Sequence, residues 1–172
     1  MSKVKQLKNT DIKEQNTIWR KGRLEDLTEL QKLFVESVKS VCSADYNAEQ
    51  IKIWTSSVEN IKRWKDIMTY QAVIVAEFNN QIVGFTSLAN FNYVDLMYVH
   101  KDFQKQGIAK RLYAVIEDIA KENKQTVLTS DVSKTARPFF SKMGFSVVKE
   151  QTVIRKGIEL TNFKMTKTLT EI

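Results

Sequence analysis

Residues 94–112 read VDLMYVHKDFQKQGIAKRL, and they decide the fold because they join a buried strand to an amphipathic helix through a charged loop. The start of a helix carries free backbone N–H groups and a partial positive charge. Gly107 stands where this helix begins, and a residue without a side chain lets the backbone approach a ligand closely. Lys105, Lys110 and Arg111 add positive charge nearby. The stretch therefore predicts a binding site for a pyrophosphate.

The loop matches neither of the two common nucleotide-phosphate motifs. It contains no G-x-G-x-x-G and no G-x-x-x-x-G-K-[ST], and only one glycine is present. These absences argue against a dinucleotide-binding fold and against a nucleoside triphosphatase. Taken alone, Gly107 is equally consistent with a glycine that merely opens the helix.

Upstream of this stretch, the hydrophobic pattern predicts a strand, two helical regions and three antiparallel strands. Apolar residues recur at helical spacing from Leu27 to Val38. The pair Asn79-Asn80 tolerates positive φ and predicts a tight hairpin between the strands on either side. The expected elements are a strand at 17–23, a helix after it, a helical region at 46–69 that Ser56-Ser57 divides, and strands at 71–78, 81–89 and 92–99.

Downstream, the helix that starts at Gly107 is expected to return to the sheet. A strand, a helix and a further strand in succession require a crossover, so the strands at 92–99 and 126–130 are expected to be parallel. The remaining elements are a helix at 107–122, a short helix at 135–142, and a closing hairpin of strands at 145–151 and 160–168. The predicted fold class is α/β with a mixed sheet and helices on both faces.

The composition bounds the class of protein. The chain has 172 residues, of which 42% are hydrophobic, so we expect a single domain at residues 17–170 behind a polar N-terminal arm at residues 1–16. The formal net charge is +7, but the lysines are spread along the chain, which weakens a nucleic-acid function. A phosphate-rich ligand explains the charge as well.

The sequence lacks the features of a membrane protein, of a secreted protein and of a cysteine-bound metal site. No apolar run approaches the roughly 18 residues of a membrane span, and no signal peptide opens the chain. Cys42 is the one cysteine, so it forms neither an internal disulfide nor a cysteine-cluster metal site. We therefore expect a cytoplasmic protein without a bound metal and without a membrane partner.

Two segments resemble motifs of one family. Gln104-x-x-Gly107-x-Ala109 resembles the [Q/R]-x-x-G-x-[G/A] motif of the GNAT (Gcn5-related) N-acetyltransferases, and residues 136–145 resemble the A-x-x-F-Y-x-x-x-G-F segment of that family. Both lie in the family's order and on the expected elements. Trp54, residues 98–100 and residues 162–165 further resemble the YafP-like bacterial branch. The resemblance implies a mostly antiparallel mixed sheet with a splayed parallel strand pair.

The resemblance also implies acetyl-CoA as cosubstrate, with the pantetheine arm held in the gap between the splayed strands. The backbone of Met97 and Val99 would hold the arm, and the amides of residues 106–109 would bind the pyrophosphate. A backbone N–H aimed at the thioester oxygen would stabilise the developing negative charge. The implied cofactor-binding residues are Met97, Tyr98, Val99, Gln104, Lys105, Gln106, Gly107, Ile108, Ala109, Lys110 and Phe140.

The catalytic candidates are less specific. Asp95 is the candidate base, since the period of a strand places Tyr93, Asp95, Met97 and Val99 on one face. A buried, hydrogen-bonded structural aspartate is the alternative. The family commonly has tyrosine at the position of Phe140, as the acid that protonates the departing thiolate. Phenylalanine has no proton to give, and Ser133, at the start of the short helix, or Tyr98 are the substitutes that the sequence offers.

The acceptor is expected to be a primary amine on a small molecule or a peptide. In this family the early helical region covers the acceptor site, so the resemblance makes Tyr46, Trp54 and Trp64 the candidate substrate-binding residues, with core packing as the alternative. A second candidate function is a catalytically degenerate subunit or sensor that binds CoA without turnover, which Phe140 favours. The expected assembly is a monomer or a homodimer.

Overall fold

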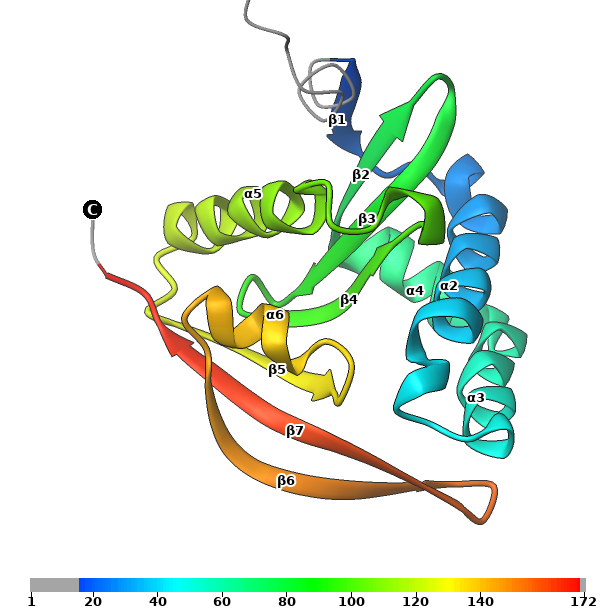
Figure 1. Ribbon diagram of the computed structural model, residues 1–172. Coiled ribbons are helices and arrows are strands. Elements are labelled where there is room, and N and C mark those ends of the chain that lie inside the picture. Colours follow the sequence, from blue (N-terminus) through cyan, green and yellow to red (C-terminus); the bar gives the residue numbers. More distant parts are fainter. Residues whose placement is uncertain (1–15, 171–172) are drawn as a thin grey trace, which may run out of the picture.

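The computed structural model describes residues 16–170, and within them a seven-stranded sheet runs through the molecule in the order β1-β2-β3-β4-β5-β7-β6 (Figure 1). Neighbouring strands are antiparallel except β4 and β5, which are parallel. The strands are β1 (Thr17–Lys21), β2 (Ala72–Phe78), β3 (Gln81–Ala89), β4 (Tyr93–Val99), β5 (Val127–Ser133), β6 (Ser146–Arg155) and β7 (Ile158–Thr168). The predicted mixed, mostly antiparallel sheet is confirmed.

Helices cover both faces of this sheet, as predicted (Figure 1). Each face has its own hydrophobic core. The first, here named the α5 core, contains residues of α5 and α6, and the core of the second face contains residues of α2, α3 and α4. The α-helices are α2 (Leu27–Val41), α3 (Ala48–Thr55), α4 (Ile61–Tyr70), α5 (Ile108–Glu122) and α6 (Arg137–Lys142). Single 3-10 turns are η1 (Leu24–Asp26), η2 (Cys42–Ala44), η3 (Ser56–Glu59) and η4 (Lys101–Phe103).

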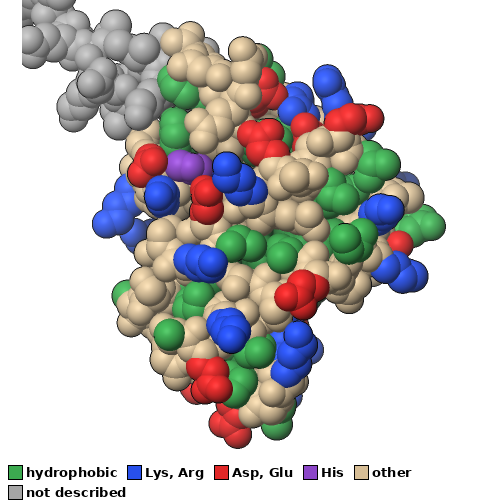
Figure 2. All heavy atoms as spheres, turned by 90° about the vertical axis from the view of Figure 1, so that its right-hand side faces the viewer, with side chains coloured by type: hydrophobic (Ala, Val, Ile, Leu, Met, Phe, Trp, Pro, Cys, Tyr) green, Lys and Arg blue, Asp and Glu red, His purple; other side chains and the backbone are tan. Residues whose placement is uncertain are grey.

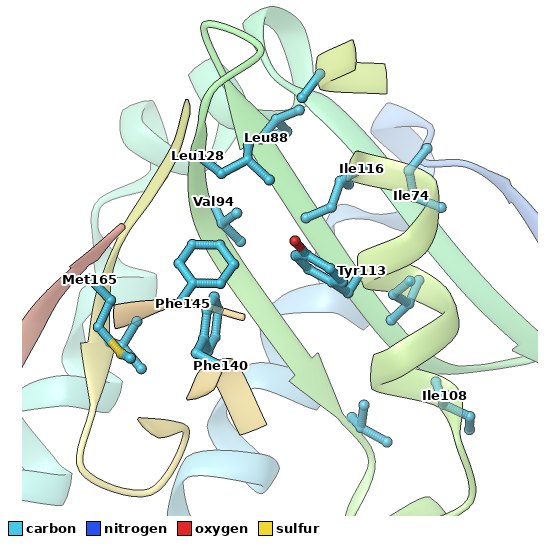
Figure 3. Close-up of a cluster of buried hydrophobic side chains, with 14 of the residues drawn as sticks. Ile74, Leu88, Val94, Ile108, Tyr113, Ile116, Leu128, Phe140, Phe145 and Met165 are labelled. Atoms are coloured by element: carbon cyan, nitrogen blue, oxygen red, sulfur yellow. The ribbon is translucent and has the colours of Figure 1, made fainter. Parts of the chain in front are cut away.

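The α5 core fixes the helix that follows the charged loop. Ile116 and Leu112 of α5 are fully buried, and each such side chain contributes about 1.5–3 kcal/mol by leaving water. Phe140 and Phe145 pack edge to face, with ring centroids 5.1 Å apart, and Figure 3 shows both rings beside Tyr113 of α5. A Cβ at Gly84 of β3 would lie 2.8 Å from Ile108, so glycine there lets the first turn of α5 lie close against the sheet.

β4 and β5 separate along their length. Their register contains a single residue pair, Tyr93 with Thr129, and one backbone hydrogen bond of 2.9 Å joins Thr129 N to Asn92 O. Figure 1 shows the two strands diverging beyond that point. The splayed parallel pair is thus confirmed: Ser130 Oγ of β5 still donates to Val94 O at 2.8 Å, and the edge of β4 beyond Val94 is not paired with β5.

A β-bulge interrupts β4 next to this gap. Leu88 of β3 pairs with Val94, while the preceding Ser87 pairs with Leu96, so Asp95 is the additional residue. An additional residue of this kind shifts the alternation of side chains by one position and re-aims a side chain. Bulges of this kind are common beside active sites.

The expectation that Tyr93, Asp95, Met97 and Val99 share one face is therefore wrong. Val99 belongs to the α5 core and Met97 packs against that core. The Asp95 carboxylate instead reaches Arg63 of α4, on the opposite face, at 2.9 Å. Strict alternation fails here because Asp95 is itself the additional residue of the bulge, which shifts the alternation of side chains along β4.

Two element boundaries also differ from the prediction. The closing hairpin is a long ribbon that turns at Lys156-Gly157, both with positive φ, so residues 152–159 are strand and turn instead of a loop. A two-residue turn with positive φ matches the twist of the flanking strands. β5 extends to Ser133, which is a strand residue and not the start of the short helix. The hairpin at Asn79-Asn80 and the break near Ser56 are confirmed.

The predicted arm at residues 1–16 lies outside the described residues except for Asn16. The boundaries of the predicted domain at 17–170 remain a prediction.

A charged cluster ties α5 to β7. Lys167 Nζ lies 2.6 Å from Glu117 Oε2, the Tyr113 hydroxyl donates to the same carboxylate, and Lys121 lies 2.9 Å from its other oxygen. Burial raises the pKa of Glu117, but the hydrogen bonds from Lys167, Tyr113 and Lys121 outweigh it and lower that pKa to about 2. The cluster therefore stabilises the charged carboxylate of the folded chain.

This cluster predicts a pH-dependent stability. The folded pKa of Glu117 lies below its unfolded value, so its contribution is present above about pH 4.5 and is lost as the pH falls toward 2. We expect Glu117→Gln to lower the free energy of unfolding at pH 7 by about 2 kcal/mol. Denaturant unfolding at pH 7 and pH 3 measures this, with the exposed Glu122→Gln on the same helix as control. A deficit equal at both pH values would contradict the assignment.

Candidate active site

Two clefts meet where β4 and β5 diverge. The first, here named the split cleft, has a volume of about 610 Å³ and lies between β4, β5, α6 and the loop before α5. The second, named the aromatic cleft, has a volume of about 630 Å³ and lies between β4, α3, α4 and the β6–β7 ribbon. Six aromatic residues line it, namely Phe34, Tyr46, Trp54, Trp64, Tyr93 and Tyr98.

Five residues line both clefts and are here named the junction residues: Trp54, Asp95, Tyr98, Asp131 and Ser133. The structure thus brings together the three side chains that the sequence offered for catalysis. A ligand in one cleft and a ligand in the other would meet at these residues.

The loop before α5 has the geometry of an anion site. Gly107 is the N-cap residue of α5 and has a φ of 84°, while Lys105 two residues earlier has a φ of 58°. Alternating left-handed positions of this kind turn successive backbone N–H groups toward one concave surface. A Cβ at Gly107 would have no neighbour within 4 Å, so the cradle is open at this point. The loop, together with Lys105, Lys110 and Lys142, lines the split cleft.

Two side chains hold the end of β4, one from this loop and one from α2. Gln104 Nε2 donates to the Val99 carbonyl at 2.6 Å, and Ser37 Oγ of α2 donates to the same oxygen at 2.5 Å. Gln106 Nε2 donates to the Asp102 carbonyl at 3.2 Å. The first residue of the Gln104-x-x-Gly107 motif therefore has a structural task, which is to fix the loop to the strand that it leaves.

Asp95 is held from two sides. Its Oδ1 accepts from Arg63 at 2.9 Å and its Oδ2 accepts from Gln71 Nε2 at 2.7 Å. The side chain is 11% exposed, and it lies at the bulge between the two clefts. The carboxylate is therefore oriented by a cation and an amide and still lines the junction.

Tyr98 and Ser133 present hydroxyl groups to the junction. The Tyr98 ring packs edge to face on Phe34, with ring centroids 4.9 Å apart, and Trp54 lines the same two clefts. Burial raises the pKa of Tyr98 well above its usual range, so this hydroxyl keeps its proton at neutral pH. Ser133 Oγ accepts from Ala136 N at 3.1 Å, which caps the turn into α6.

Phe140 lies at the wall of the split cleft but is 4% exposed and belongs to the α5 core. Its ring packs against Phe139 at 5.7 Å and Phe145 at 5.1 Å (Figure 3). An apolar ring in that position shapes the cleft and supplies no proton.

The three aromatic residues proposed for the acceptor all line the aromatic cleft. Tyr46 and Trp64 are also buried core residues of the second face. The Tyr46 hydroxyl donates to Thr161 O at 2.6 Å and accepts from Lys134 N at 2.9 Å, which joins the segment before α3 to β7 and to the end of β5. Core packing and cleft lining are therefore compatible at these positions.

Sequence reasoning did not assign six polar residues to the aromatic cleft, namely Ser57, Arg63, Asp131, Arg155, Thr161 and Asn162. Asp131 accepts from Tyr93 at 3.2 Å and from Gln151 at 3.0 Å. Burial, with the charges of Asp131 and Asp95, raises the pKa of Tyr93 to about 12. The one signal for Arg155 in the sequence was Gly157, which marks a turn between two runs of β-branched residues.

The surface does not gather the positive charge into one patch on the face that Figure 2 shows. Lysine and arginine side chains are interspersed there with aspartate and glutamate. None of the helices within residues 16–170 has both the length and the apolar character needed to cross a membrane.

Comparison with known proteins identifies the family. Residues 42–167 match the model of the acetyltransferase (GNAT) domain. The uncharacterised N-acetyltransferase YafP of Escherichia coli K12 is 35% identical over 140 residues, which are 81% of this chain and 88% of that protein.

Solved structures agree with this result. A GCN5-related N-acetyltransferase from Rhodopseudomonas palustris superposes with a TM-score of 0.85 and 29% identity, covering 90% of this chain and 96% of that one. The PaiA N-acetyltransferase of Thermoplasma acidophilum, solved in complex with coenzyme A, has a TM-score of 0.70 and 21% identity, covering 89% and 99%. The chain belongs to the GNAT family and is an acyl-CoA-dependent N-acetyltransferase.

Proposed function

We propose that the protein transfers the acetyl group of acetyl-CoA to a primary amine by direct attack of the amine on the thioester. The observation that carries this proposal is the meeting of the two clefts at the junction residues, where β4 and β5 diverge. The PaiA structure with coenzyme A, and a Salmonella typhimurium acetyltransferase solved with acetyl-CoA, support the choice of cosubstrate.

The split cleft suits the cosubstrate. The amides of residues 106–109 at the start of α5 would bind the diphosphate, with Lys105, Lys110 and Lys142 neutralising its charge. The edge of β4 from Asp95 to Tyr98 offers backbone groups to the amides of the pantetheine arm, whereas the Val99 carbonyl already accepts from Gln104 and Ser37. In this arrangement the thioester lies at the junction.

The reaction requires a base and a proton donor. The acceptor ammonium must lose a proton before its nitrogen attacks the carbonyl carbon, and we assign this proton to Asp95, through a water where the distance demands it. A backbone N–H of β4 would stabilise the negative charge that develops on the carbonyl oxygen. When the C–S bond breaks, the electron pair leaves with sulfur, and the second proton that the attacking nitrogen must lose passes to the thiolate.

The departing thiolate is a tolerable leaving group, since thiols have a pKa near ~8.5. Of the two hydroxyl groups we choose Tyr98, because Ser133 Oγ is already engaged by Ala136 N at 3.1 Å in the turn into α6. We propose that the Tyr98 hydroxyl donates a hydrogen bond to the sulfur. Phe140 takes no part beyond shaping the cleft.

Cys42 is free and buried beside the split cleft, and a free thiol suits a reducing compartment. We therefore place the reaction in the cytoplasm.

Binding and turnover test the proposal separately. At a concentration 100 times its Kd, CoA should stabilise the fold by about 2.7 kcal/mol. For a chain of this size that corresponds to a rise in Tm of about 5–10 °C, measured by thermal denaturation. Acetyl-CoA with a panel of amines should then release free thiol at a rate that depends on the amine. An unchanged Tm with millimolar CoA, or no thiol release with any amine, would contradict the proposal.

A further inference from the structure

Arg155 is a charged residue at the outer side of the aromatic cleft. It is the last residue of β6, directly before the Lys156-Gly157 turn, and it is exposed. It also lines a smaller cavity of about 380 Å³ with Ile53, Ser56 and Asn60, so Arg155 lies between this cavity and the aromatic cleft. A guanidinium in this position is open to solvent and also lines the cleft.

The position of Arg155 is fixed by the fold. The ribbon of β6 and β7 is fastened to α3 by Gln50 Nε2, which donates to Glu159 O at 2.9 Å, and to the segment before α3 by the Tyr46 hydroxyl, which donates to Thr161 O. Arg155 itself pairs with Ile158 in the last rung before the turn. Its backbone is therefore held at the edge of the cleft.

The charges of the aromatic cleft are unequally compensated. Four charged residues line it, and Arg63 is paired with Asp95 at 2.9 Å. Asp131 accepts hydrogen bonds from Tyr93 and Gln151 but has no cationic partner among residues 16–170. None of the ion pairs in the described part of the chain includes Arg155. The cleft is thus lined by one acid, Asp131, and one guanidinium, Arg155, that form no ion pair among residues 16–170.

A ligand that matches this pattern carries a cation and an anion close together. Arg155 lines the same cleft as the junction residues Tyr98 and Asp131, so one ligand in that cleft can contact both ends. Asn162 Oδ1 is buried in the wall of the same cleft and lacks a hydrogen-bond partner within residues 16–170, which leaves an acceptor for a ligand N–H. The aromatic walls suit an apolar body.

Resting on the proposed function, we propose that the acceptor is a free amino acid with an apolar or aromatic side chain. Arg155 binds its carboxylate, the aromatic walls bind its side chain, and Asp131 and Asn162 direct its amine to the junction. Arginine suits this task because its planar fork binds a carboxylate through two parallel hydrogen bonds.

The experiment compares matched amines in the thiol-release assay. The probes are phenylalanine, leucine and tryptophan, each beside its carboxamide and its decarboxylated amine. We expect each amino acid to have a kcat/KM about 10- to 100-fold above those of its carboxamide and its decarboxylated amine, which both lack the carboxylate. Equal use of all three forms, or preference for the carboxamides, which would indicate a peptide acceptor, overturns the inference.

The variant Arg155→Met locates the effect. It should raise KM for the amino acids by about 10- to 100-fold and change KM for the carboxamides by less than about threefold. The matched control is Lys149→Met, an exposed cation on the same strand that lines neither cleft. An equal loss for both substrate forms overturns the role of Arg155. Failure of every amine to release thiol defeats the proposed function itself, which distinguishes the two.

Discussion

Replacing Gly107 by glutamate is expected to weaken CoA binding by at least about 100-fold. The side chain would project from the N-cap position of α5 into the concave surface, where nothing of the protein lies within 4 Å of the new Cβ. Its negative charge would occupy the place proposed for the diphosphate and use the same backbone N–H groups. Titration calorimetry with CoA measures the loss.

The matched control is Gly157→Glu. Gly157 also has a positive φ, 81°, and a Cβ added there would also have no neighbour within 4 Å, so both variants carry the same backbone strain and the same charge. Gly157 lies in the β6–β7 turn, outside the split cleft. Normal CoA binding by folded Gly107→Glu would show that the diphosphate lies elsewhere.

Asp95→Asn is expected to lower kcat about 100- to 1,000-fold near neutral pH and to leave the Kd for CoA within about twofold. Asparagine keeps an oxygen for the hydrogen bond from Gln71 but cannot accept a proton. The deficit should shrink as the pH approaches the pKa of the acceptor amine, because free amine then forms without a base. Steady-state thiol release across a pH series measures this.

The control for this variant is Asp66→Asn. Asp66 lies on α4, pairs with the exposed Lys62 at 2.5 Å, and lines neither cleft. Its loss should leave kcat unchanged. If the Asp95→Asn deficit is the same at every pH, Asp95 holds Arg63 in place and the base is another group.

The form of the loop before α5 could be predicted from the sequence because its requirements are local, while its role in binding a diphosphate stays a prediction. Gly107 stands at the start of a helix with lysines on either side, and this single stretch of chain is enough to predict an anion site. In the structure Gly107 and Lys105 both have a positive φ, which belongs to the same short stretch of chain.

The placement of Asp95 could not be predicted in the same way. Its direction depends on a bulge, and a bulge is a property of how β3 and β4 pair, which no window of β4 alone contains. Strict alternation therefore assigned Asp95 to the wrong face, although the structure still places it at the junction.

The outer part of the aromatic cleft depends on contacts between distant segments. Arg155 reaches the cleft because the ribbon continues to Lys156-Gly157 and because Gln50 and Tyr46 fasten it near α3. These contacts span more than a hundred residues, so the pattern of β6 alone cannot reveal them. The sequence could not decide whether Tyr46 and Trp64 belong to the core or to the cleft, because each residue belongs to both.

A crystal structure of the protein with acetyl-CoA would show where the cosubstrate lies. We expect the diphosphate against the amides of residues 106–109 and the thioester between β4 and β5, within reach of Asp95 and Tyr98. A diphosphate bound away from Gly107, or β4 and β5 paired along their whole length with the arm outside, would contradict this expectation.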